Sequence, residues 1–171
     1  MSVLPVLQFP HPLLRRKSRP VEDFGEELAA LADDLLETMY VKGGIGLAAP
    51  QVGQLKQLVV VDLHASEEDE QPRAPRVYVN PAIVDRSGET LIEEGCLSVP
   101  EFTAEVKRAR RIVIQFRNVK GEPEEEALED LAAACLQHEL DHLLGKLFLE
   151  RLPPLKRQMV KKRLAKLAQS A

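Results

Sequence analysis

The sequence has 171 residues and a net charge of −4, with 44% hydrophobic and 29% charged residues. These proportions exclude an intrinsically disordered chain, and no apolar run reaches the roughly 18 residues of a membrane-spanning helix. No composition shift divides the chain, so we predict a single domain over residues 1–171. The sequence does not open with a charged segment followed by an apolar one, as a signal peptide would, so we expect the protein in the cytoplasm without membrane contact.

An amphipathic helix is predicted over residues 23–42, where hydrophobic side chains recur at steps of three and four. Gly43 and Gly44 end this helix, since glycine is a poor helix former. The predicted apolar face consists of Phe24, Leu28, Leu31, Leu35 and Met39.

Short strands are predicted next, at residues 58–61, 77–79, 90–92 and 111–116, where β-branched and aromatic residues cluster. An acidic segment with proline, residues 65–76, separates the first two strands and is predicted to be an exposed loop. Strands this short and closely spaced favour a largely antiparallel sheet.

A second helix is predicted from Ala127 through the sequence QHELDH at 137–142, ending before Gly145. A third helix is predicted over about 153–169. We therefore predict an α+β fold, with short, mostly antiparallel strands packed around a central metal-binding helix and with a C-terminal helix.

The C-terminal segment is strongly basic, whereas the remaining 150 residues carry 16 basic and 27 acidic side chains. Such a basic amphipathic helix is either a solvated terminal helix or a contact surface for nucleic acid. Residues 151–171 contain no acidic residue and seven basic ones: Arg151, Lys156, Arg157, Lys161, Lys162, Arg163 and Lys166.

The strongest chemical signal is the HExxH pattern within the second helix. His138 and His142 are four residues apart, hence about 40° apart around the helix and about 6 Å along it, so both imidazoles can reach one metal ion. Glu139 points about 100° away from His138 and would flank the ion. This arrangement indicates metal-assisted hydrolysis, with the carboxylate as proton acceptor.

The third ligand must come from upstream. A metzincin protease would carry a third histidine where this chain has Phe148, and a protease with a downstream glutamate would need an acid within residues 162–166, which read KRLAK. Cys96 follows Gly95 in a loop-like segment, and its thiolate would bind Zn²⁺ or Fe²⁺ well.

A closed structural zinc site that includes Cys135 is the rival prediction. Cys135 lies on the same predicted helix face as the histidines, but it stands about 10.5 Å along the helix from His142, too far for one tetrahedral ion. A three-ligand site with an open, catalytic position is therefore favoured. A disulfide between Cys96 and Cys135 is disfavoured for a cytoplasmic chain.

Three segments resemble the signature motifs of the peptide deformylase family, in the family's order. They are GIGLAAPQ at 44–51, EGCLS at 94–98 and QHELDH at 137–142. The resemblance extends over nearly the whole chain and implies a hydrolase that removes the N-formyl group from the N-terminal methionine of nascent polypeptides.

The resemblance also implies residue roles. Cys96, His138 and His142 would hold one divalent metal ion, with Fe²⁺ as the native ion and Zn²⁺ or another divalent ion as substitutes. Glu139 would be the general base, while the Gln51 side-chain amide and the Leu97 backbone N–H would stabilise the oxyanion. The implied substrate pocket consists of Gly44, Ile45, Gly46, Ile92, Glu94, Gly95, Leu131, Ala134 and Cys135. By hydrophobic pattern alone, the apolar members of this set are core residues.

The implied partners are N-formylmethionyl nascent peptides and, through the basic C-terminal helix, the ribosome; no DNA partner is expected. An aspartate at position 141 would pair with an arginine, for which Arg108 is the candidate, unless Asp141 forms an ordinary surface pair. Two further hypotheses stay open at this point: a metallopeptidase or amidase of other specificity, and a metal-binding ribosome partner without catalysis.

Overall fold

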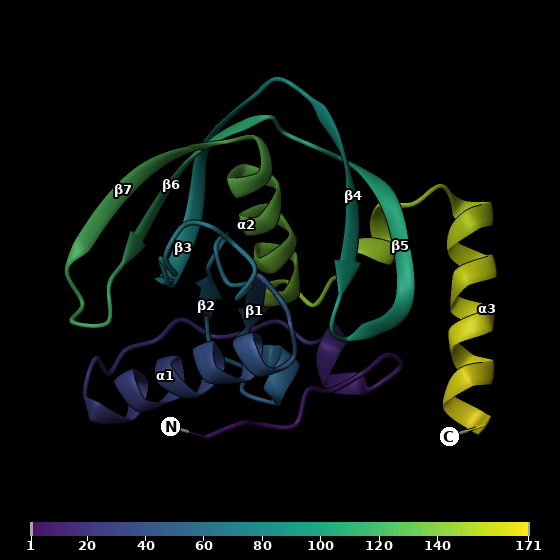
Figure 1. The fold of residues 1–171 in the computed structure, drawn as a ribbon, viewed down its shortest axis with the longest axis horizontal. Coiled ribbons are helices and arrows are strands. Elements are labelled where there is room, and N and C mark those ends of the chain that lie inside the picture. Colours follow the sequence, from purple (N-terminus) through teal and green to yellow (C-terminus); the bar gives the residue numbers. More distant parts are fainter. Residues whose placement is uncertain (1, 171) are drawn as a thin grey trace.

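The computed structural model describes residues 2–170, with the side chain of the last of these left aside. Its strands lie between helices α1 and α2 in the sequence, and α3 ends the chain that is described (Figure 1). In order, they are the 3-10 helix η1 (Pro12–Arg15), α1 (Glu26–Val41), β1 (Gly46–Ala48), η2 (Ala49–Val52), β2 (Leu58–Val61), β3 (Arg76–Ser87), β4 (Thr90–Cys96), β5 (Val99–Arg108), β6 (Arg111–Arg117), β7 (Pro123–Glu129), α2 (Asp130–Leu143), η3 (Phe148–Arg151) and α3 (Pro154–Ser170).

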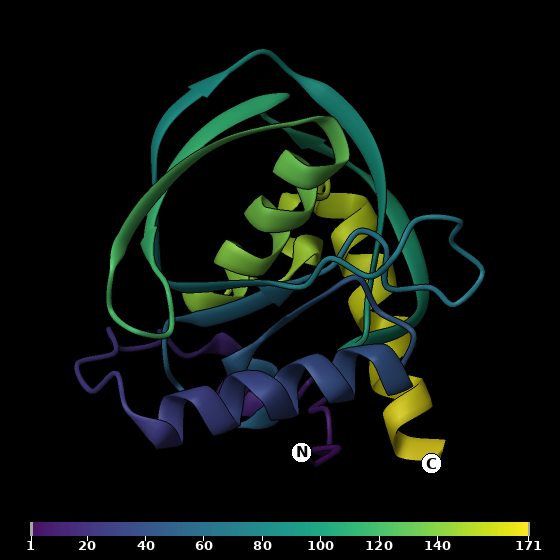
Figure 2. The same cartoon turned by 60° about the vertical axis from the view of Figure 1, so that its left-hand side comes forward.

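The strands form two antiparallel sheets around helix α2. One sheet has the strand order β1-β2-β3-β6-β7, and the other is the β4-β5 pair. In both views of the ribbon, the sheets curve around α2, while α1 covers the lower side of the five-stranded sheet (Figures 1 and 2). The fold class predicted from the sequence is therefore confirmed.

Helix α2 is central because its apolar residues face the inner side of the larger sheet. Ala133 and Leu136 pack in one core with Ile112 and Ile114 of β6, all of them almost fully buried. The Gln137 side chain pins the helix further, because it donates to Ala109 O at 2.8 Å and accepts from Ala109 N at 3.0 Å. The helix is thus fixed both by apolar burial and by directed hydrogen bonds.

Helix α1 uses the apolar face that its periodicity predicts. Leu28, Leu35 and Met39 are buried against Leu58 and Val60 of β2 in a second core. Because β2 is buried on both faces, it joins this core to the one beneath α2. The two helices therefore sandwich the central part of the larger sheet.

Three strands, β1, β5 and β7, were not predicted, and α1 and α2 each begin three residues later than expected. β1 is only three residues long, β5 contains Pro100, and β7 contains three consecutive glutamates, so the local strand signal of all three is weak. The predicted helical start at Ala127 is wrong, because residues up to Glu129 pair with β6. Asp130, with a φ of 53°, marks the change of direction into α2.

The N-terminal segment, residues 2–18, contacts the ends of two of the sequence motifs, GIGLAAPQ at 44–51 and EGCLS at 94–98. Leu7 N donates to Gln51 O at 2.7 Å, and Phe9 N donates to Ser98 O at 2.8 Å. Further on, Ser18 N donates to Leu143 O, at the end of α2. The segment therefore ties together three parts of the chain that are distant in sequence.

Helix α3 lies outside the rest of the fold, beside β5 (Figure 1). It is attached mainly through Leu164, which is buried with Phe148 and Leu149 of η3 in a third core. Over residues 2–170, none of the helices combines the length and the hydropathy needed to cross a bilayer.

Candidate metal centre

Cys96, His138 and His142 come together at the inner face of α2. Their ligand atoms all lie within 4.8 Å of one another, and Cys96 Sγ is 3.4 Å from His142 Nε2. The two histidine rings meet edge to face with centroids 5.0 Å apart. The four-residue spacing of His138 and His142 thus brings both rings to one place, as the sequence predicts. The third donor, Cys96, comes from upstream.

Cys96 reaches this place because β4 ends there. The pairing of β4 with β5 is regular until Gly95, opposite Thr103, and then shifts so that Cys96 faces Val99. Such an irregularity redirects a side chain at a strand end. The local break in the β4-β5 ladder therefore presents the thiol to α2.

His138 is oriented by a buried carboxylate. Its Nδ1 lies 2.8 Å from Glu94 Oε1, so the other ring nitrogen is left for the side facing Cys96. Arg108 in turn donates to both oxygens of Glu94, at 2.7 and 2.8 Å. A carboxylate on the far nitrogen of a histidine is the usual way in which proteins fix a ligating imidazole.

The ionic network continues past Arg108. Arg108 Nη1 donates to Asp141 Oδ2 at 2.8 Å, and Arg151 donates to both Asp141 oxygens, at 3.1 and 2.7 Å. The Arg108–Asp141 pair is buried, so the alternative of an ordinary surface pair is wrong. Burial opposes both charges, but their hydrogen bonds outweigh it: the pKa of Asp141 is lowered and that of Arg108 is raised.

Glu139 lies beside the donor cluster in a desolvated position. Its Oε1 is 3.9 Å from His142 Nε2 and has no hydrogen-bond partner among the described residues. Burial raises its pKa to about 7, with the His138 charge opposing and the Glu94 charge adding to the shift. A carboxyl group with a pKa near neutrality can both accept and return a proton.

Gly46 of β1 makes room for this carboxylate. A Cβ atom built at position 46 would lie 2.8 Å from Glu139 Oε2 and 3.1 Å from Cys135 Sγ. Only a residue without a side chain therefore permits this approach of strand to helix.

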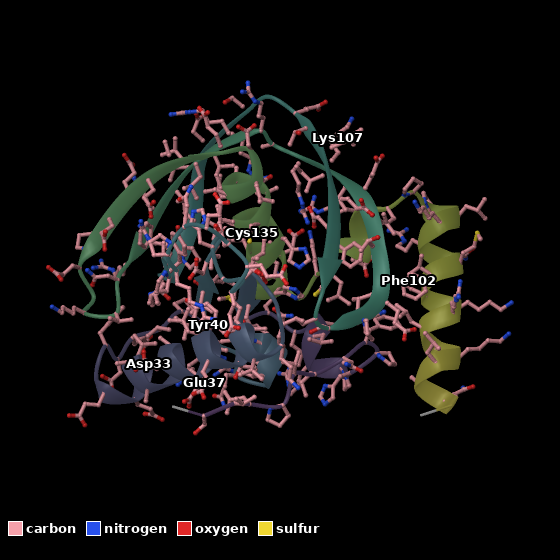
Figure 3. All side chains as sticks on the ribbon, in the orientation of Figure 1. Asp33, Glu37, Tyr40, Phe102, Lys107 and Cys135 are labelled. Atoms are coloured by element: carbon pink, nitrogen blue, oxygen red, sulfur yellow. The ribbon has the colours of Figure 1, made fainter. Side chains whose placement is uncertain are left out.

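Cys135 is separate from the three-donor cluster. It lies one turn before His138 on α2, near the centre of the molecule (Figure 3), and its sulfur is outside the set of mutually close donors found in residues 2–170. Burial raises the pKa of its thiol, and the Glu139 charge adds to the effect. The closed four-ligand site is therefore wrong, and Cys135 remains a neutral thiol.

Gln51 points its amide toward the same cluster. Its Nε2 donates to Ser98 Oγ at 3.0 Å and lies 3.6 Å from Cys96 Sγ, while its Oε1 accepts from Ala48 N at 3.0 Å. The last bond fixes which end of the amide is the donor. An N–H donor is thus held beside the sulfur.

A cavity of about 830 Å³ opens over the cluster. Ile45 and Leu131 are 37% and 48% exposed, so the core assignment suggested by their hydrophobic pattern is wrong for both. The cavity is lined by all nine residues of the predicted substrate pocket: Gly44, Ile45, Gly46, Ile92, Glu94, Gly95, Leu131, Ala134 and Cys135. Leu97 lines it too, beside Cys96.

Sequence reasoning missed lining residues from two other segments. Val6 and Gln8 come from the N-terminal segment, and Pro100 and Phe102 come from the start of β5. Neither segment carries a motif, and β5 itself was not predicted. Of these four residues, only Pro100 could have been expected at the cavity, because it lies two residues after the EGCLS motif.

These residues fit a divalent metal ion. A thiol and two imidazoles supply soft and borderline donors, and the set leaves room for a further ligand, as in catalytic rather than structural sites. The orienting carboxylate on His138 and the unpartnered oxygen of Glu139 complete an arrangement suited to hydrolysis of an amide.

Comparisons with known proteins agree with this geometry. The family model described as polypeptide deformylase matches residues 3–158. Peptide deformylase 2 of Xanthomonas campestris is 49% identical over 98% of this chain and 97% of its own length, and the peptide deformylase of Phenylobacterium zucineum is 48% identical over the full length of both. The crystal structure of a peptide deformylase from Legionella pneumophila superimposes with a TM-score of 0.89 at 42% identity, covering 98% of this chain and 96% of that one.

Proposed function

The chain belongs to the polypeptide deformylase family, whose metal-dependent reaction removes the N-formyl group from nascent chains, and we propose that it performs this reaction with Glu139 as general base and with Cys96, His138 and His142 as metal ligands. The observation that carries these roles is the desolvated Glu139 carboxylate beside the three converging donors. Its Oε1 lies 3.9 Å from His142 Nε2 and has no hydrogen-bond partner within residues 2–170.

A divalent metal ion held by these donors lowers the pKa of water and polarises a carbonyl group. Glu139 accepts a proton from the attacking water and later delivers it to the leaving amine, which its pKa of about 7 allows. The Gln51 side-chain amide and the Leu97 backbone N–H donate to the oxyanion that forms from the formyl oxygen. Gln51 is preorganised for this by its bond from Ala48 N.

The same cavity accommodates the methionine side chain. Ile45, Leu131 and Cys135 provide apolar walls, and the partial exposure of the first two offers them to a ligand. β1 and β4, with Gly46 and Gly95, are edge strands on the two sides of the cavity. An extended peptide adds main-chain hydrogen bonds to such edges, which supports acceptance of many nascent chains.

The decisive experiment is anaerobic turnover of a formyl-methionyl peptide beside its acetylated and unmodified counterparts. Metal-loaded wild-type protein should release formate from the first substrate alone. The Glu139→Gln variant should retain metal and lose turnover, because the amide keeps the size of the side chain but cannot accept the proton.

Glu129→Gln is the matched control, since Glu129 is an exposed carboxylate outside the cavity. It should turn over at the wild-type rate. No formate release from fully metallated wild type, or an undiminished rate in Glu139→Gln, contradicts the proposed roles. Cleavage of an internal peptide bond would instead indicate a peptidase.

Fe²⁺ is the proposed native ion. One thiolate and two imidazoles suit Fe²⁺ and also accept Zn²⁺, and other divalent ions can substitute. Anaerobic purification from cells grown without added metal, followed by elemental analysis, tests this assignment. Zinc alone at one equivalent, with full turnover, would overturn it.

Helix α3 is the proposed ribosome contact of a single catalytic domain comprising residues 1–171. Lys156, Lys162 and Lys166 are exposed and form no ion pair within residues 2–170, so they are available to phosphate groups. The substrate also emerges at the ribosome, which supports the cytoplasm as the location of the enzyme.

Changing these three lysines to glutamine should weaken ribosome co-sedimentation and flatten its dependence on salt. Turnover of a short formylated peptide should stay unchanged, because α3 contributes nothing to the cavity. Ribosome binding that is equal for both proteins at every salt concentration would exclude this surface.

A further inference from the structure

A second cavity lies behind α2, on the side of the helix opposite the metal centre. Its volume is about 550 Å³, within the range of small-molecule sites, and none of its lining residues belongs to the substrate cavity. Figure 3 labels Lys107, one of its lining residues, near the top of the molecule and well away from Cys135 at the centre.

The inner wall of this cavity is the back of the ionic network. Arg108, Asp141 and Arg151 all line it. Their charges are already compensated, because Asp141 lies between the two arginines and Arg108 also holds Glu94. These groups therefore add polarity to the wall and almost no net charge.

The rim has an uncompensated positive charge. Glu89 and Lys107 pair with each other at 3.6 Å. Lys17 and Arg86 line the cavity too, and within residues 2–170 neither forms an ion pair. Two positive charges thus remain at the cavity, against no free negative charge.

Ser18, whose buried hydroxyl has no partner among the described residues, lines the same cavity. Ser18 is 8% exposed, and its Oγ has no hydrogen-bond partner among the described residues. Its backbone is occupied, since Ser18 N donates to Leu143 O and Ser18 O accepts from Gln57 Nε2. A buried hydroxyl is normally paired, so this Oγ is a donor still to be used.

Another part of the wall is apolar, although Gln57 and Gln137 also line the cavity. Pro81, Ala82 and Ile83 come from β3, and Leu140 and Leu144 come from α2 and the residue after it. Polar groups at one part and aliphatic groups at another are the composition of a site for a small amphiphilic molecule.

We propose that this cavity binds a small phosphate monoester with an apolar body. A phosphate monoester concentrates up to two negative charges and three strong acceptor oxygens in one compact group. The negative charges match two uncompensated cations, Lys17 and Arg86, and an acceptor oxygen matches the Ser18 hydroxyl. The apolar body of the ligand would lie against β3 and α2. The proposal is independent of the reaction at the metal centre.

Phenyl phosphate is the probe that we would titrate into Zn²⁺-loaded protein, following backbone amide shifts by NMR. We expect saturable shifts at Ser18, Ile83 and Leu144. The Lys17→Gln/Arg86→Gln double variant should bind about tenfold more weakly or worse, because two charge-assisted contacts are lost. Since both side chains are exposed, the variant should fold normally and deformylate at the wild-type rate.

The matched control is Arg16→Gln/Lys120→Gln, which removes the same charge from exposed positions outside the cavity. It should bind the probe as wild type does, and a saturating methionyl peptide should leave that affinity unchanged. An equal loss of affinity in both double variants would show that the probe responds to net charge alone, which would overturn the site. Shifts confined to residues 94–98, displacement by the peptide or no saturation would each overturn the site.

Discussion

Helices α2 and α3 are of similar length but hold their places in opposite ways. In α2, ten of fourteen residues are buried, among them the polar residues His138, Glu139 and Asp141. Among residues 154–169 of α3, only Leu164 is buried, while Leu155 and Met159 are 73% and 66% exposed. Burial of charge in α2 is possible because each charged group is paired or lies at the metal centre, whereas the charges of α3 remain hydrated.

This difference in burial indicates at which positions of the two helices function constrains the choice of residue. A side chain of α2 can rarely change without leaving a buried partner unsatisfied, whereas most of α3 needs only to stay helical and basic. Substitutions in α2 should therefore reduce activity and stability more than substitutions in α3.

The largest effect is expected for His142→Ala. His142 is a proposed direct ligand. Its loss should therefore lower metal affinity and turnover more than loss of a group that only orients a ligand, which costs about 10–100-fold. Metal content and formate release measure both. Lys162→Gln in α3 should change neither, and a comparable loss of turnover in that variant would contradict the division between the helices.

Arg108→Met tests the buried network. Removing the guanidinium leaves Glu94 and Asp141 buried with fewer partners, so we expect the free energy of unfolding to fall by about 3–5 kcal/mol. Urea denaturation of the metal-loaded protein measures this. Arg163→Met, which removes an exposed guanidinium 5.7 Å from the Phe102 ring, should cost less than about 1 kcal/mol.

Leu164→Ala tests the main apolar anchor of α3. The substitution should lower the free energy of unfolding by about 2–3 kcal/mol, because it empties a buried position in the core shared with η3. Formate release from a short peptide should stay at the wild-type rate at temperatures well below unfolding. A parallel drop in turnover would show that α3 communicates with the cavity, contrary to the comparison.

The smallest effect is expected for Met159→Ser. Because this side chain is exposed, thermal unfolding should indicate a change within about 0.5 kcal/mol. Loss of ribosome co-sedimentation with unchanged stability would identify Met159 as part of a contact surface. A large destabilisation would mean that the exposed face of α3 is covered in the folded protein.

The same contrast explains what the sequence could predict. α1 and α2 have clear helical periodicity, and the HExxH spacing brings His138 and His142 together by helix geometry alone. The third donor, Cys96, was reached by excluding other positions, and its arrival depends on a break in the β4-β5 ladder that no local pattern announces.

Other features arise only from tertiary pairing. β7 contains glutamates at Glu124, Glu125 and Glu126, which have low strand propensity, and it forms because β6 offers a complete edge. Arg151 was read as one of seven basic residues of the tail, yet it pairs with Asp141 behind the metal centre. Charge alone could not separate Arg151 from the solvated lysines of α3.

The N-terminal segment has a consequence for the order of events during synthesis. Because the chain emerges from its N-terminus, the segment can bind the loop of Gln51 and then that of Ser98 before α2 exists. The strands and α1 can thus form a scaffold that already holds Cys96 and Gln51 but lacks His138, Glu139 and His142. These three residues enter together once α2 has been synthesised, so the proposed site stays incomplete until that helix docks.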